Sequence, residues 1–224
     1  MLFRSWPIAN SPALLEVKSL MHLLPSPSYL QDTVLWIPSI MGRFNSASTW
    51  DHLRNPTPKV PWYRLIWFLG NIPRHSFISW LAILNRLSTH DRIFTFTPGP
   101  LACVLCHQGM ETHDHLFFDC SFSSFVWQGI LQRLKISHSA PSWGSLVDWA
   151  SRSWKKMIPS HLIPKMCLGL AIYSIWKERN ARIERSEAKS KEQILHALCL
   201  SISNQIHIKW KNDPHLPQYV ARWC

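Results

Sequence analysis

The chain contains the stretch Cys103-Val104-Leu105-Cys106, followed eight residues later by His115-Leu116-Phe117-Phe118-Asp119-Cys120. Its potential metal ligands follow the pattern Cys-x2-Cys-x8-His-x4-Cys, formed by Cys103, Cys106, His115 and Cys120. Three thiolates and one neutral imidazole complete the tetrahedral coordination of Zn²⁺ and leave no position for water. A closed site of this kind organises structure and activates no nucleophile. The stretch therefore predicts a zinc-organised binding module and not a zinc enzyme.

The spacing also predicts how the chain presents these ligands. The Pro-Gly-Pro run at 98–100 interrupts any preceding helix, which places the first two cysteines on a tight turn. Five positions on a regular α-helix separate two side chains by about 140°, so His115 and Cys120 do not share one helical face. We expect His115 before a helix and Cys120 at its start, with Ser121 or Ser123 as the N-cap. The helix is indicated by apolar residues at helical spacing: Phe122, Phe125, Val126, Ile130 and Leu134.

Two alternatives to this ligand set are open at the level of sequence. In the first, Cys103 and Cys106 are a chance pair of buried thiols, since free cysteines are commonly buried. In the second, another histidine of the same loop replaces His115 as a ligand. His113 is the stronger rival because it shortens the loop to x6, and His107 is the weaker one.

Composition indicates a folded protein in a reducing compartment. The chain has 224 residues, of which 46% are hydrophobic and 13 are tryptophan, enough for a substantial core. Three of the six cysteines lie in the metal pattern, and Cys167, Cys199 and Cys224 are scattered. This spacing does not predict a disulfide framework.

The charge favours a polyanionic partner. Lysine and arginine number 24 against 13 acidic residues, giving a formal net charge of +11. Such an excess favours nucleic acid, RNA or DNA, without indicating sequence specificity. Polar residues interrupt the first 20 positions, and the apolar stretch 166–176 is too short to span a bilayer. We therefore expect an intracellular protein, nuclear or cytoplasmic, with no membrane segment.

The predicted fold is mainly α, with a small N-terminal β-hairpin and a central zinc knuckle-like loop. The hairpin consists of strands at 34–37 and 42–44, followed by a short helix that Ser46 or Ser48 caps and that ends before Pro56. Further helices are expected at 61–69, from Pro73 to Leu87, at 143–154, from Pro164 to Arg185 and at 189–210. Glu178 and Arg182 form an i,i+4 pair that is typical of a helix surface.

The sequence contains little of the residue patterns that catalysis requires. A polymerase or RNase H needs clustered carboxylates that hold two divalent metals, and the 13 acids of this chain are spread thinly. A phosphate-binding loop needs a glycine-rich turn, which a chain with seven glycines does not show. The sequence favours a non-enzymatic role.

The segment from about Trp62 to Trp127 resembles the reverse-transcriptase zinc-binding domain that follows the polymerase in plant LINE-type retrotransposons. The matching text includes Ile72-Pro73-Arg74, Phe77-Ile78-Ser79-Trp80-Leu81-Ala82, the Cys103–Cys106 turn and His113-Asp114-His115-Leu116-Phe117-Phe118-Asp119-Cys120. Further along, Ile175-Trp176-Lys177-Glu178-Arg179-Asn180 resembles the helix that often follows this domain. The resemblance implies that His115, and not His113, is the ligand. Together with the periodicity of the rest of the chain, it predicts three regions: an irregular segment 1–31, the zinc-binding-like domain 32–135 with its core at 61–127, and a helical region 136–224.

The resemblance, together with the charge, predicts a zinc-binding, nucleic-acid-binding and non-catalytic module. Zinc would fix the loop against the helix that carries Phe77 and Trp80, and Arg74, Arg86 and Arg92 are candidate phosphate contacts. One alternative is a protein-interaction module in which the zinc loop presents Leu116, Phe117 and Phe118 to a partner. Another is a retroelement remnant with a preserved fold and no selected role.

Overall fold

The computed structural model describes residues 12–20, 23, 33–55, 57–93, 102–138, 142–185 and 188–223. Within these ranges the chain is mainly helical and contains no β-strand. It divides into two compact units, residues 1–58 and 59–224. No helix in the same ranges is long and apolar enough to cross a lipid bilayer.

The first unit contains two short helices, α1 (Pro12–Leu20) and α2 (Ser46–Leu53). The N-cap of α2 is Asn45, one residue earlier than the predicted serines, and its side-chain oxygen accepts a hydrogen bond from the Ser48 N–H at 2.9 Å. Asparagine is among the preferred N-cap residues because its side chain satisfies a free N–H of the first turn.

The predicted N-terminal β-hairpin is wrong. Residues 36–42 form a turn, in which the Trp36 N–H donates to the Gly42 carbonyl at 2.8 Å and the Trp36 ring packs edge-on against Phe44. Pro38 has no N–H to donate to a ladder, and Gly42 adopts a left-handed φ of 66°. Val34 and Ile37 are exposed, so no packed surface supports an isolated strand pair, which is marginal in water.

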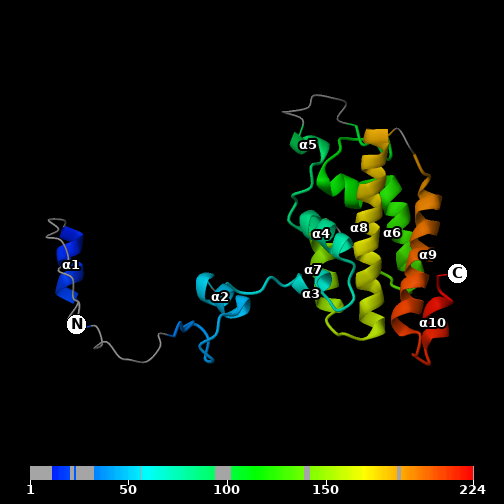
Figure 1. The fold of residues 1–224 in the computed structure, drawn as a ribbon. Coiled ribbons are helices and arrows are strands. Elements are labelled where there is room, and N and C mark those ends of the chain that lie inside the picture. Colours follow the sequence, from blue (N-terminus) through cyan, green and yellow to red (C-terminus); the bar gives the residue numbers. More distant parts are fainter. Residues whose placement is uncertain are drawn as a thin grey trace. The chain divides into compact units, whose positions relative to one another are not determined.

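The second unit carries the other helices (Figure 1). They are α3 (Tyr63–Ile66), α4 (Pro73–Ile83), α5 (His90–Ile93), the π-helical turn η2 (His115–Asp119), α6 (Ser121–Leu134), α7 (Trp143–Ser153), α8 (Pro159–Arg185), α9 (Lys191–Trp210) and α10 (Leu216–Val220). The expected start of α4 at Pro73 is confirmed, with the proline in the first turn, where its missing N–H costs nothing. The helix expected at 61–69 is limited to the single turn α3.

Helix α8 is the central element of this unit. It packs against α4, α6 and α9, and α6 also packs against α9 and η2 (Figure 1). One hydrophobic core joins buried residues from Leu65 in α3 to Trp223 after α10. The metal-ligand stretch contributes Cys103, Leu116 and Cys120 to that core. The candidate site is therefore built into the main core of the unit.

Helix α8 starts five residues earlier than predicted. Pro159 is its first residue, and Pro164 lies inside the helix, buried with Leu162 and Ile163. A proline suits the first turn of a helix, so the sequence offered two starts, and Pro164 was the wrong choice. Helix α9 ends at Trp210 as expected, and Ser190 begins it with a capping box to Gln193.

Candidate metal centre

The first two cysteines lie on a tight, knuckle-shaped turn. Ala102 and Met110 form an antiparallel bridge, within which the Cys103 N–H donates to the Gly109 carbonyl at 3.0 Å. The His107 N–H donates to the Cys103 carbonyl at 2.8 Å. His107 and Gly109 have φ values of 58° and 66°, so the chain reverses through left-handed backbone. This turn brings both sulfurs to the same side of the loop, while the Pro-Gly-Pro run at 98–100 lies outside the described residues.

The π-helical turn η2 brings the other two ligands together. The Cys120 N–H donates to the His115 carbonyl at 2.7 Å, an i→i+5 hydrogen bond that replaces the usual i→i+4 bond. The wider turn reduces the angular offset that a regular α-helix would impose over five residues. Cys120 then has extended backbone and is the N-cap of α6. The prediction that Cys120 lies at a helix start is confirmed, and the N-cap is Cys120 instead of Ser121 or Ser123.

The four side chains converge on one point. The ligand atoms of Cys103, Cys106, His115 and Cys120 all lie within 4.8 Å of one another. Two of the separations are 3.9 Å, between the Cys103 and Cys120 sulfurs, and 3.3 Å, between the Cys106 sulfur and His115 Nε2. Tetrahedral zinc with its usual bond lengths requires about 3.8 Å between two sulfurs and about 3.5 Å between sulfur and nitrogen. The donor set and its spacing fit a zinc ion.

Comparison with known families agrees with this geometry. Residues 44–127 match the family described as zinc-binding in reverse transcriptase. The matched segment contains all four converging ligands and covers less than half of the chain. Neither the curated proteins nor the solved structures gave a match.

The rival histidines of the matched segment lie outside the cluster. His113 is buried, and its ring packs against Phe117 at 5.1 Å and Trp143 at 5.4 Å, while its Nδ1 faces the Asp114 carboxylate. His107 is exposed on the knuckle turn. The structure therefore brings His115, and not these two, to the three thiols.

The hydrogen bond between Cys103 and Cys120 shifts the pKa values of the two thiols in opposite directions. The hydrogen bond between Cys103 and Cys120 lowers the pKa of Cys120, and the N–H groups of Ser123 and Phe122 at the start of α6 lower it further. The same hydrogen bond, together with burial, raises the pKa of Cys103. The hydrogen bond thus favours ionisation of Cys120 over that of Cys103, and a metal that binds all four ligands must displace the remaining thiol protons.

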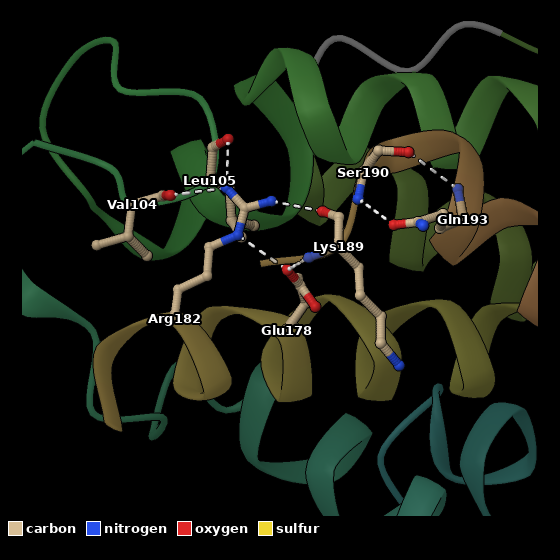
Figure 2. Close-up of polar contacts among 7 residues, drawn as sticks. All are labelled: Val104, Leu105, Glu178, Arg182, Lys189, Ser190 and Gln193. Carbon is tan, nitrogen blue, oxygen red and sulfur yellow. Dashed lines mark hydrogen bonds and ion pairs between the residues drawn. The ribbon is translucent and has the colours of Figure 1, made fainter. Parts of the chain in front are cut away.

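Arg182 ties the knuckle turn to α8 (Figure 2). Its Nη1 donates to the carbonyls of Val104 and Leu105, the two residues between the first pair of ligands, at 2.9 and 3.0 Å. Its Nε donates to Glu178 at 2.9 Å, and its Nη2 donates to the Lys189 carbonyl at 2.7 Å. One guanidinium therefore fixes the metal loop, α8 and the α8–α9 connection together.

Arg179, which is buried, holds the other end of the loop. Arg179 donates to Glu111 from Nη2 at 2.6 Å and from Nε at 3.0 Å, and the Glu111 side chain is 0% exposed. Glu111 also accepts a hydrogen bond from the His90 N–H at 3.0 Å. The paired charge is thus fully desolvated but hydrogen-bonded, the condition under which a buried ion pair is tolerated.

These contacts correct two expectations. Glu178 is 4% exposed, so the Glu178–Arg182 pair is an internal contact and not a helix-surface pair. The loop was expected to be fixed against α4, the helix that carries Phe77 and Trp80. It is instead joined to α8 by hydrogen bonds and an ion pair, and Phe77 is half exposed. A signal was present in the sequence, because Arg179 and Arg182 continue the 4-3 spacing of the buried residues Leu168, Ile172 and Ile175.

Of the three arginines proposed as phosphate contacts, Arg74 lies apart from the other two. Arg74 is exposed at the start of α4, with its guanidinium 5.5 Å from the centre of the Tyr173 ring. Arg86 is exposed after the other end of α4, and Arg92 in α5 donates to the nearby Asn85 carbonyl. An 11-residue helix is about 16 Å long, so Arg74 is separated from the other two.

Proposed function

We propose that the chain is a non-catalytic zinc-binding module of a LINE-type retrotransposon reverse transcriptase that contacts the phosphate backbone of RNA or DNA. The convergence of Cys103, Cys106, His115 and Cys120 carries this proposal. A Cys3His set is closed, so a bound zinc ion would hold the loop in shape and would offer no site for substrate. The family match of residues 44–127 supports the reverse-transcriptase setting.

The nucleic-acid part of the proposal is supported by charge. A formal net charge of +11 attracts a polyanion, and phosphate contacts give affinity without reading bases. The alternative is a protein-interaction surface at Leu116, Phe117 and Phe118. Leu116 is 0% exposed and Phe117 is buried, so Phe118, which is half-buried, would be the residue of this set that faces a partner.

The metal part is tested by the zinc content of the purified chain. The wild type is expected to contain one zinc per chain and Cys106→Ser none, since three remaining ligands cannot close the site. Cys167→Ala is the matched control, because Cys167 is a buried thiol of α8 outside the cluster. Equal zinc in the wild type and Cys106→Ser would overturn the site.

The nucleic-acid part is tested by titrating a fluorescent oligothymidine or oligouridine of about 20 nucleotides with the wild-type chain. Phosphate-driven binding should weaken steeply between about 50 mM and about 200 mM salt. Absence of binding at the lower salt concentration would overturn this part and leave the metal site standing.

A further inference from the structure

A basic groove runs between the start of α4 and the adjoining surfaces of α8 and α9. It has a volume of about 450 Å³, and its basic side chains are Arg74, Lys177, Arg185 and Lys189. All four residues are exposed, and the ion pairs found among the described residues involve none of them. Among the described residues, the groove therefore gathers four positive charges that form no ion pair, three from the 177–189 segment and one from the start of α4.

The one acid among the described residues lining this groove does not offset these charges. Glu178 is buried, and its Oε1 accepts hydrogen bonds from Arg182 Nε at 2.9 Å and from the Lys189 N–H at 2.7 Å. Its negative charge is balanced by Arg182, which points toward the metal loop. The open side of the groove is left with the four cations.

The backbone of Lys189, at one side of the groove, is held by hydrogen bonds. The Lys189 N–H and carbonyl are both bonded, to Glu178 and to Arg182, and the next residue, Ser190, begins α9 with a capping box (Figure 2). Figure 2 shows the Lys189 side chain pointing away from the Arg182 guanidinium. A cation on a fixed backbone loses less freedom when it meets a ligand, so this arrangement favours binding.

Tyr173, an aromatic residue that lines the groove, already contacts two side chains of α4. The Tyr173 ring lies 4.7 Å from the His75 ring and 5.5 Å from the Arg74 guanidinium, both of which come from α4. Base stacking, the usual source of base contacts in single-strand binders, therefore has little free surface here. The exposed cations of the groove are instead suited to contacts with phosphate groups.

We infer that this groove takes the phosphate backbone of a single-stranded nucleic acid, without base specificity. The inference rests on the proposed function and moves the contact surface from the metal loop to the junction of α4, α8 and α9. A concave basic groove suits one strand, since single-strand binders follow the backbone with a positively charged groove. Of the three arginines predicted from the sequence, only Arg74 lines the groove.

The test compares two triple variants of the full chain that lose the same charge. The groove variant carries Lys177→Gln, Arg185→Gln and Lys189→Gln, and the control carries Lys155→Gln, Lys156→Gln and Lys211→Gln. All six residues are exposed, so both variants should fold, which circular dichroism and zinc content check. The probe is a fluorescent oligothymidine of about 20 nucleotides, titrated over a range of salt concentrations.

The groove variant should bind more than about tenfold more weakly than the wild type near 0.1 M salt. The slope of log affinity against log salt should fall by about 2, because each lost single-strand phosphate contact removes about 0.7. The control should retain the wild-type slope. Equal weakening in both variants, or wild-type affinity in the groove variant, would overturn the groove while leaving nucleic-acid binding intact.

Two further probes, a duplex of the same length and anionic vesicles, separate this inference from its rivals. A wild-type chain that binds no oligonucleotide overturns the proposed function as well as the groove. Binding to a duplex of the same length with higher affinity than to the single strand overturns the single-strand assignment. Binding to vesicles containing an anionic phosphoinositide, but not to oligothymidine, would assign the groove to a lipid headgroup and overturn the inference.

Discussion

At the scale of single residues, Arg182 is the side chain on which the metal loop most depends. Arg182→Gln would leave Glu178 buried without its charge partner and free two carbonyls of the knuckle turn. Breaking a buried ion pair from one side costs about 3–5 kcal/mol, so we expect a loss of about 3 kcal/mol in the free energy of unfolding measured with urea. Arg152→Gln is the control, because Arg152 pairs with Asp148 at 3.7 Å in an exposed position and should cost less than about 1 kcal/mol. Similar losses in the two variants would contradict the role given to Arg182.

His75 gives the protein a predicted pH dependence. Burial and the neighbouring Arg74 lower the pKa of His75 from 6.5 to about 4. Between these values the unfolded chain binds a proton that the folded chain does not, so the folded state loses stability as the pH falls. The total effect is at most about 3 kcal/mol, and it should be absent in His75→Phe, which keeps a ring and cannot titrate. Urea denaturation from pH 7 down to about pH 4 measures the difference, and parallel curves for both proteins would refute it.

At the scale of elements, the sequence predicted the converging Cys and His residues better than the conformation of the polypeptide around them. Ligand spacing reports local chemistry, and the five-residue step from His115 to Cys120 correctly excluded a shared α-helical face. The π-turn that meets this constraint depends on a single i→i+5 hydrogen bond, which no residue pattern identifies. The hairpin at 34–44 failed because strand propensity means little without a surface to pack on.

The arginines of α8 show a different limit of sequence reasoning. Charged residues are expected at the surface, yet Arg179 is buried because Glu111 lies opposite it in the fold. Its partner is 68 residues away in the sequence, a distance over which periodicity carries no information. The candidate ligands were therefore predictable from the sequence, whereas the residues that position them required the tertiary structure.

This dependence on α8 predicts that residues 44–127 are not self-sufficient. A fragment with these limits has the four ligands but lacks Arg179 and Arg182, and loss of supporting residues around a metal site costs about 10–100-fold in affinity. We expect its zinc affinity, measured by competition with a chromophoric chelator, to be at least about tenfold weaker than that of the full chain. The fragment 59–224, which is the second compact unit, should match the full chain. Equal affinities for 44–127 and 59–224 would show that α8 is dispensable.

At the scale of the whole molecule, the second compact unit connects the metal cluster to the basic groove. Zinc would hold Cys103 and Cys106, the two carbonyls between them accept from Arg182, and Arg182 donates to Lys189 at the edge of the groove. Every step is a direct hydrogen bond or a ligand position. A change at the metal site therefore has a physical route to the proposed nucleic-acid surface.

Removal of zinc should accordingly weaken oligonucleotide binding. Structural zinc contributes about 10–16 kcal/mol to folding in small zinc fingers, so its loss is enough to disorder the knuckle turn and release Arg182. After chelation we expect faster amide hydrogen exchange at residues 103–106 and 178–193, and an affinity for oligothymidine lower by about tenfold. Helix α7, which has no part in this chain of contacts, should exchange at nearly its original rate. Unchanged binding by the zinc-free chain would separate the two sites and leave the ion with a local role in the loop alone.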